Sequence, residues 1–332
     1  MSASVATAEL IADRGEAAVD DHFFRSRPFL DAEGITHTLK IESDEAQLLA
    51  PLLVRDIPGS DYRDAVSPYG YPGLIESDGR RGGVRRTLPA VSPADTPPPP
   101  PTLDPAAIDW TATTLVSIFI RHALGPSPLG GATERNVVQV ADPALPPKSR
   151  PSDRRQVRRN LEDGYSLDLV PARETTPRQR AAFLDVYEQT MRRTGAAAHY
   201  FFGATYFDRV LEADRSWLAL ATAPSGEAAA ASIAAVSDGY LHYYLSGTAG
   251  SHLPQAPMKN VVTLLVEHSR KLGLPLNLGG GISAGDALEE FKRGFANRQQ
   301  AWLTSELICD EEKYAELSAG REAGGFFPAY RA

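Results

Sequence analysis

The residues best suited to catalysis lie in one short segment near the C-terminal end of the sequence. A glycine-rich turn comes before an expected helix whose positions i, i+3, i+4 and i+7 are Leu288, Phe291, Lys292 and Phe295. Lys292 therefore lies beside an apolar stripe rather than opposite it. A cation held there by aromatic neighbours could stabilise a phosphate or a developing oxyanion. A lysine that only covers apolar surface with its stem fits the same pattern.

Three further residues are candidates for handling a proton or positioning an amine. Asp286 lies at or near the N-cap of the same expected helix. In the expected strand YLHYYLSG, alternation places His242, Tyr244 and Ser246 on one face and Tyr243 on the other. One face belongs to the core, and the other could line a site with imidazole and hydroxyl groups. The residue types leave both interpretations open.

The densest basic segment is Lys148–Arg159, with six positive charges against one aspartate. If this segment is helical from Asp153, four of its arginines fall on one side of the helix. We interpret these arginines, with four more from an earlier segment, as candidate contacts to phosphate groups, and a solvated basic face is the alternative. The eight residues are Arg154, Arg155, Arg158 and Arg159, and Arg80, Arg81, Arg85 and Arg86.

Composition limits the class of protein. The chain has 332 residues, enough for two domains or for one domain built twice. Lys and Arg number 34 against 42 Asp and Glu, a formal net charge of −8, which excludes a broad basic coat for nucleic acid but not a local basic site. A single cysteine, Cys309, excludes a disulfide framework and a multi-cysteine metal site, and its strand context predicts a small buried hydrophobe. No histidine spacing favours a catalytic zinc, so no metal is expected.

Several nucleotide-binding and hydrolase motifs are missing. The sequence has no G-x-x-x-x-G-K-S/T loop and no G-x-S-x-G elbow. The acetyl-CoA loop Q/R-x-x-G-x-G/A is also absent, and its nearest match, Arg270–Pro275, fails at the last position. Gly279, Gly281 and Ala284 fit G-x-G-x-x-G/A, but a dinucleotide-binding turn belongs to an early strand–helix unit. We therefore expect no bound cofactor.

The elements that position these residues change along the chain. Residues 1–20 are expected to form a frayed or weakly helical tail. Short apolar runs predict strands in the first half, and from residue 151 helices and strands alternate. The proline-rich segment 93–105 predicts an exposed loop or polyproline II spacer, with binding to an aromatic-lined domain as the alternative. Because no signal peptide and no apolar window of membrane-spanning length is visible, a cytoplasmic protein is expected.

Five stretches of the sequence, in order and spacing, resemble the FemAB-like branch of the GNAT superfamily. The resemblance runs from about Phe23 to Leu317, and its middle and last stretches are the most specific. The stretches are SPYGYPG at 67–73, RRQVRRNLEDGY at 154–165, VYEQTMRRTGAAAHYFF at 186–202, LHYYLSGT at 241–248, and LGGG with DALEEFKRGF at 278–295.

The resemblance implies an α/β fold of two GNAT-like lobes, each a mixed central sheet flanked by helices, with a cleft between them. Residues 21–150 with 296–332 would form the first lobe, and residues 151–295 the second. Larger relatives insert a coiled-coil arm, and this sequence has no sustained heptads in the corresponding region.

The resemblance also implies a set of site residues. In tRNA-dependent members a Phe-Lys pair lies by the acyl-donor end, and here that pair is Phe291 and Lys292. Other residues in the matching stretches are implied as substrate contacts, namely Tyr69, Tyr71, Tyr200, Tyr243 and Gly280.

The function expected from residues and resemblance together is amide-bond formation. The family includes ligases that move an amino acid from aminoacyl-tRNA onto an amine, in peptidoglycan bridges and in some peptide natural products, and it also includes N-acetyl- and N-acyltransferases that are taken to use acyl-CoA. We therefore expect a bacterial aminoacyltransferase with the acceptor end of aminoacyl-tRNA as one partner and a small-molecule or peptide amine as the other. The alternative keeps the fold and uses acyl-CoA as donor. A more distant alternative is a non-catalytic binding module that uses the proline-rich segment.

Overall fold

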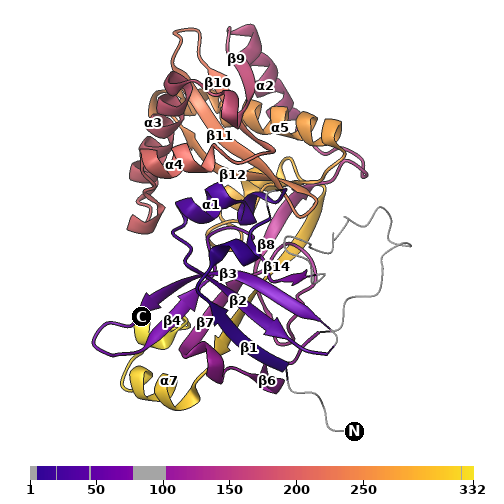
Figure 1. Cartoon of the computed structure of the whole chain (residues 1–332). Coiled ribbons are helices and arrows are strands. Elements are labelled where there is room, and N and C mark those ends of the chain that lie inside the picture. Colours follow the sequence, from indigo (N-terminus) through magenta and orange to yellow (C-terminus); the bar gives the residue numbers. More distant parts are fainter. Residues whose placement is uncertain (1–5, 20, 45, 78–101, 323) are drawn as a thin grey trace. The chain divides into compact units, whose positions relative to one another are not determined.

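The computed structural model describes residues 6–19, 21–44, 46–77, 102–322 and 324–332 (Figure 1). Contacts divide the chain into two compact units. Unit 1 holds residues 1–19, 24–135 and 301–332, and unit 2 holds residues 20–23 and 136–300. Several expected features lie outside the described residues, namely Arg80, Arg81, Arg85, Arg86 and residues 93–101 of the proline-rich segment.

Unit 1 is built on a sheet in the order β6-β1-β2-β3-β4-β7-β14, which ends at β14 (Arg298–Ile308), and β5 also pairs with β3. The β1/β6 and β4/β7 pairs are parallel and the other pairs are antiparallel. The elements within this unit are β1 (Ala6–Ile11), α1 (Arg27–Ala32), β2 (His37–Glu42), β3 (Gln47–Asp56), β4 (Arg63–Val66), β5 (Ile75–Ser77), β6 (Ile108–Asp109), β7 (Leu115–Arg121) and α7 (Glu311–Ser318).

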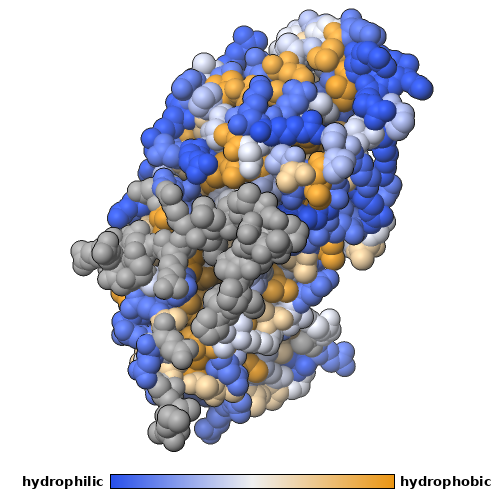
Figure 2. Space-filling model, turned by 90° about the vertical axis from the view of Figure 1, so that its right-hand side faces the viewer, coloured by the Kyte–Doolittle hydropathy of each residue, from blue (hydrophilic) through white to orange (hydrophobic). Residues whose placement is uncertain are grey.

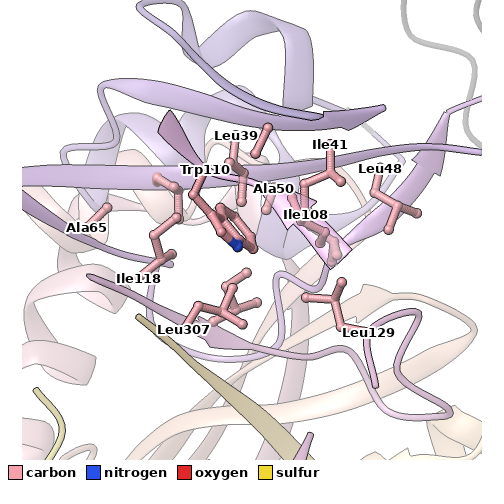
Figure 3. Close-up of a cluster of buried hydrophobic side chains, with 14 of the residues drawn as sticks. Leu39, Ile41, Leu48, Ala50, Ala65, Ile108, Trp110, Ile118, Leu129 and Leu307 are labelled. Carbon is pink, nitrogen blue, oxygen red and sulfur yellow. The ribbon is translucent and has the colours of Figure 1, made fainter. Parts of the chain in front are cut away.

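The core of unit 1 surrounds Trp110 (Figure 3). Its indole ring lies among buried aliphatic side chains that include Leu39, Ile118 and Leu307. Each such side chain contributes roughly 1.5–3 kcal/mol when it is removed from water. The indole N–H donates to the Pro105 carbonyl oxygen at 3.1 Å, so burial of the ring leaves no unpaired donor.

The N-terminal segment is not the tail that we expected for residues 1–20. Ala6–Ile11 form β1, which is antiparallel to its neighbour β2 and parallel to its neighbour β6. Ala6 and Ala8 are buried, and the residues that alternate with them are exposed. The expectation was wrong because alanine-rich sequence has little strand propensity of its own, whereas pairing on both sides and burial of one face stabilise a strand.

Unit 2 is built on a second run of strands, in the order β14-β8-β13-β12-β11-β10-β9. The β12/β13 pair is parallel, and the β8/β13, β11/β12, β10/β11 and β9/β10 pairs are antiparallel. The elements are α2 (Pro151–Glu162), β9 (Ser166–Pro171), α3 (Pro177–Thr194), α4 (Ala204–Val210), β10 (Ser216–Thr222), β11 (Ala228–Ser237), β12 (Tyr240–Thr248), α5 (Met258–Leu272), β13 (Leu276–Asn277) and α6 (Ala287–Arg293).

Local sequence signals explain where the long helices of unit 2 begin and end. Thr176 and Gln179 form a capping box at the start of α3. Gly195 ends α3 and Gly273 ends α5, both in the left-handed conformation that favours glycine. Figure 1 shows α3 on one side of this sheet and α5 on the other, so apolar side chains cover both faces. The strands and helices predicted for this half are confirmed, and so is the mixed α/β class.

Two strands contribute residues to both units, namely β8 (Thr133–Ala141) and β14 (Arg298–Ile308). The chain passes from one unit to the other within these strands, after residues 135 and 300. From the sequence, the boundaries of the lobes were expected after residues 150 and 295. No helix among the described residues has both the length and the apolar character needed to span a membrane.

Candidate active site

Lys292 lies in the last turn of α6, with only 8% of the residue exposed. Its Nζ donates to the Gly280 carbonyl oxygen at 2.6 Å. Burial lowers the pKa of the Lys292 ammonium to about 8, and the negative charge of Asp286 acts in the opposite direction. The side chain therefore does not reach solvent as a snorkelling lysine would. It is a buried cation that binds its proton near neutral pH.

Phe291 supports this helix from its apolar side. Its ring packs edge-to-face on Phe295, with 5.5 Å between centroids. Both rings belong to the apolar cluster between α5 and the sheet, which contains Leu265 and Leu278. This packing fixes the rotation of α6 and so the direction in which the neighbouring Lys292 leaves the helix.

The glycine-rich turn before α6 brings main-chain atoms to the lysine. Gly279 has a φ of 75°, a conformation that residues with a side chain rarely adopt. A Cβ on Gly280 would lie 2.6 Å from the Asn136 side chain, closer than a Cβ atom comes to another non-hydrogen atom. These glycines are therefore required by backbone conformation and packing, without any nucleotide.

Asp286 serves as the cap that closes this turn. Its Oδ1 accepts from the Glu289 N–H at 2.7 Å, and its Oδ2 accepts from the N–H groups of Ile282 (2.7 Å) and Ser283 (3.0 Å). These hydrogen bonds lower the pKa of the Asp286 carboxyl. The prediction of an N-cap is confirmed. A carboxylate with three N–H partners is a weak base, so the structure favours a positioning role over proton transfer.

The strand β12 departs from strict alternation. Its register with β11 shifts between Ser232 and Ala234, which marks a β-bulge. The Tyr243 and Ser246 hydroxyl oxygens lie 2.6 Å apart, so these residues share a side of the strand. The sequence had placed them on opposite faces, because alternation cannot reveal an extra residue in a strand. Burial raises the pKa of Tyr243 to about 12.

His242 is buried, with 1% of the residue exposed, and desolvation lowers its pKa to about 4. Its Nδ1 lies 3.1 Å from Asn277 Nδ2, and its Nε2 lies 3.2 Å from the Ser237 carbonyl oxygen. Since an amide N–H₂ can only donate and a carbonyl can only accept, Nε2 carries the proton. Asn277 Oδ1 in turn accepts from the Gly279 N–H at 2.8 Å. His242 thus reaches the glycine-rich turn through Asn277, as a neutral ring with both nitrogens engaged.

The tyrosines proposed for unit 2 occupy separate places. The Tyr244 hydroxyl lies 2.7 Å from the Tyr206 hydroxyl, and its ring packs edge-to-face on Phe23. Tyr200 ends a 3-10 turn after α3, and its carbonyl oxygen accepts from the Tyr187 hydroxyl at 2.6 Å. No hydrogen bond or ring contact described in this structure joins Tyr200 or Tyr244 to Lys292.

The basic segment forms α2, as expected, with its arginines facing outward. The inner side of α2 is fixed to α5 by Asp153, which pairs with Lys259 at 2.8 Å, and by Asn160, which bonds to Asn260 at 2.7 Å. Figure 2 shows the right-hand side of Figure 1, where hydrophilic residues cover much of the upper part of the surface with hydrophobic residues between them. The exposed arginines of α2 are Arg154, Arg155, Arg158 and Arg159.

Tyr69 and Tyr71 belong to unit 1. The Tyr69 N–H donates to Glu33 Oε2 at 2.8 Å, and the Tyr71 ring packs edge-to-face on Trp302 and Phe24, each with 5.5 Å between centroids. Both side chains are half-buried. Within unit 1, Tyr71 therefore forms part of an aromatic cluster.

The nearest match to an acetyl-CoA loop lies at the wrong end of its helix. Arg270–Pro275 spans the C-terminal end of α5, where Gly273 is the cap. A helix C-terminus presents carbonyl groups, which repel a pyrophosphate. At the N-terminal end of α5, the N-cap Pro257 has no N–H group, and in the preceding 3-10 turn, which contains Pro254, the Ala256 N–H is bonded to the Leu253 carbonyl oxygen.

Sequence reasoning missed three polar residues that organise this site. Asn136 and Asn277 bond the glycine-rich turn, and the Glu289 carboxylate accepts from the Gly285 N–H at 2.7 Å. Their signal was weak because single amides and a helical glutamate occur everywhere in proteins. No three His, Cys, Asp or Glu residues among those described gather as metal ligands.

Unit 1 contains a buried histidine that the sequence did not single out. His122 is 2% exposed, its Nε2 lies 2.8 Å from Ser305 Oγ, and burial lowers its pKa to about 4. Cys309 follows β14 and packs against the core of unit 1, and burial raises the pKa of its thiol. The prediction of a small hydrophobic residue agrees with this packing, although Cys309 is partly rather than fully buried.

Comparison with known proteins agrees with this architecture. Residues 148–293 match the family model of an acetyltransferase (GNAT) domain. The chain is similar to the crystal structure of FemX, with a TM-score of 0.57 and 10% identity over 88% of this chain and 93% of that chain. It is also similar to a conserved protein of unknown function from Bacteroides thetaiotaomicron VPI-5482, with a TM-score of 0.50 and 11% identity over 89% and 93% of the two chains. No curated protein sequence matches.

The family match covers the elements from α2 to α6, and so includes Lys292, the glycine-rich turn and β12. The similarity to FemX extends the same fold to most of the chain. The chain is therefore an acyltransferase that carries a GNAT domain over residues 148–293 and has the fold of FemX.

Proposed function

We propose that this acyltransferase forms amide bonds by moving an amino acid from aminoacyl-tRNA to the amine of a small molecule or peptide. The observation that carries the proposal is the buried ammonium of Lys292 in the last helix of the GNAT domain. An aminoacyl ester is already activated, so neither a covalent enzyme intermediate nor a metal is needed. The protein must orient two substrates and stabilise the charge that develops between them.

In the proposed reaction, the free acceptor amine attacks the ester carbonyl carbon. The C–N bond forms, the carbonyl oxygen becomes an oxyanion, and Lys292 stabilises it as a cation. Collapse of the intermediate breaks the bond to the ribose oxygen and releases the tRNA. The amine loses one proton and the departing ribose oxygen gains one, so no net proton is consumed.

The side chains near Lys292 support a cationic role for it. Asp286 is occupied by three N–H donors, and His242 is neutral with both ring nitrogens engaged. Neither residue is a competent general base at neutral pH. With a pKa of about 8, Lys292 is mostly protonated at pH 7.

Two features of unit 2 favour tRNA over acyl-CoA as the donor. The four outward arginines of α2 offer contacts to several phosphates of an RNA backbone. At the start of α5, the N-cap Pro257 removes one of the N–H groups with which a helix N-terminus holds a pyrophosphate, and the N–H groups of Lys259 and Asn260 donate to backbone carbonyls. The net charge of −8 is compatible with a local contact of this kind, because the arginines lie together on one helix.

The donor can be tested directly. The purified chain is supplied with a mixture of amines and with either charged tRNA or acyl-CoA, and product is followed by mass spectrometry, with and without RNase. We expect RNase-sensitive product from charged tRNA alone. Product that survives RNase and requires acyl-CoA would instead establish the CoA-dependent reaction. If neither donor gives product while a bound partner is retained, the chain is a binding module.

A further inference from the structure

The glycine-rich turn is held from outside the GNAT domain by Asn136 of β8. Asn136 Nδ2 donates to the Gly281 carbonyl oxygen at 3.0 Å. Its Oδ1 accepts from the Val137 N–H at 2.7 Å. Because the second bond requires the oxygen to face Val137, the orientation of the amide is fixed and Nδ2 must face the turn.

This side chain continues a ladder of main-chain hydrogen bonds. The Gln139 N–H donates to Gly279 O at 3.1 Å, and the Leu278 N–H donates to Gln139 O at 2.9 Å. Beyond Gly279 the turn leaves the strand, and the Asn136 amide takes the place of the next backbone donor. Asp286 bonds the far side of the turn through Ile282. The turn is therefore held at both ends by short polar side chains.

Gly280 lies between Asn136 and Lys292. Any Cβ at residue 280 would collide with the Asn136 amide at 2.6 Å, so this amide packs directly against the turn. On the other side, the Gly280 carbonyl oxygen accepts from Lys292 Nζ at 2.6 Å. Asn136 thus packs against the residue whose carbonyl oxygen accepts from Lys292, so the position of this carbonyl depends on Asn136.

We propose that Asn136 is a positioning residue for Lys292, which it serves by holding the Gly279–Gly281 turn so that the Gly280 carbonyl fixes the ammonium. Its effect on catalysis rests on the proposed function. A charge stabilises a transition state best when it is already in place. A mobile turn would therefore weaken the stabilisation that Lys292 gives to the oxyanion, although the charge itself would remain.

The first test is a double-mutant cycle in the full-length chain. Asn136→Asp keeps the shape and the acceptor for Val137 but loses the donor to Gly281. We expect Asn136→Asp to lower kcat about tenfold with little change in KM, and to have no further effect in a Lys292→Met background. Equal losses in both backgrounds would mean that Asn136 acts on the fold in general, and would overturn the proposal.

A matched control is Asn297→Asp. Asn297 is also an asparagine of unit 2 whose Oδ1 accepts from a backbone N–H, that of Asp142 at 2.7 Å, and whose Nδ2 donates to a backbone carbonyl, at 2.9 Å. It does not bond the glycine-rich turn. Its kcat should stay within about twofold of the wild type, and thermal melting of each variant separates loss of folding from loss of positioning.

The second test does not depend on the reaction. The chain has six lysines, and ¹³C NMR of lysine Cε gives the titration of each, with Lys292→Arg as the assignment. In the wild type we expect Lys292 to titrate near pH 8. In Asn136→Ala the loosened turn admits water, so the midpoint should rise by about one unit. An unchanged midpoint overturns the proposal. A shifted midpoint in a chain that transfers no acyl group refutes the proposed function instead and leaves the positioning role in place.

Discussion

Two regions of unit 2 each bury a titratable base, and burial has opposite consequences for them. On α6, Lys292 falls from an ordinary pKa of 10.5 to about 8. On β12, His242 falls from 6.5 to about 4. Desolvation is the largest cause of both shifts. It brings the lysine into the range where enzymes work and takes the histidine out of it.

The comparison extends to unit 1, where burial lowers the pKa of His122 to about 4, as it does for His242. Both histidines are neutral at physiological pH, and their hydrogen bonds are those of buried structural polar groups. A buried histidine therefore marks a site less reliably than a buried lysine does here. Four of the five experiments below test whether function follows this difference between α6 and β12, and the third tests α2.

The largest expected effect comes from removal of the α6 cation. Lys292→Met keeps most of the volume and deletes the charge, and it should lower kcat on the order of tenfold to a thousandfold because the oxyanion loses its partner. Single-turnover transfer from charged donor measures the chemical step. A variant that folds and transfers at the wild-type rate would remove Lys292 from the mechanism.

The second effect is the pH dependence of the α6 cation. Lys292 is protonated below its pKa of about 8. As an electrostatic stabiliser it should give a rate that falls about tenfold per pH unit above 8, as the charged fraction falls. Lys292→Arg retains its charge, so its rate, though lower, should lack this falling limb. A rate that rises through pH 8 in the wild type alone would mean that neutral Lys292 acts as a base.

A smaller effect is expected from the outer face of α2. Arg154→Glu together with Arg158→Glu should raise the KM for aminoacyl-tRNA on the order of tenfold and reduce its salt dependence, with kcat nearly unchanged. Arg178→Glu together with Arg192→Glu, at two exposed arginines of α3, reverses the same number of charges and is the matched control. If the control raises KM as much, the KM for aminoacyl-tRNA depends on the net charge of the protein and not on contacts with α2.

The smallest effect on rate is expected on β12. His242→Gln should change kcat less than about threefold. The ring is neutral and buried, and it reaches the glycine-rich turn only through Asn277. A loss of kcat comparable to that of Lys292→Met would contradict the functional difference proposed between α6 and β12.

His242 should instead influence stability at acid pH. In the unfolded chain histidine binds a proton near 6.5, whereas in the folded chain His242 does so only near 4. Acid therefore favours unfolding, and this contribution, on the order of 3 kcal/mol at most, is fully present above pH 6.5 and is lost toward pH 4. Urea unfolding across this range should show a shallower loss in His242→Gln than in the wild type.

Much of the fold could be predicted from local pattern. The helices around Phe183 and Val261 and the hairpin at Asp238 have clear periodicity or turn residues, and the structure has all three. The strand at Ala6–Ile11 and the bulge in β12 were missed, because both depend on neighbouring strands. The site was found in part: Lys292 and Asp286 carry helical signals, whereas Asn136 lies about 150 residues away in sequence.

The sequence by itself determined which residue types were available at the site. The glycine-rich turn, the N-cap aspartate and the lysine beside an apolar stripe follow from short-range spacing, because helices and turns are local structures. Only the tertiary structure decided which of these groups is chemically poised. Burial on α6 sets the proton affinity of Lys292, and the amide of Asn136 reaches its turn only because β8 lies beside it. Desolvation and long-range hydrogen bonds are set by what surrounds a group in space, and no spacing along the chain records them.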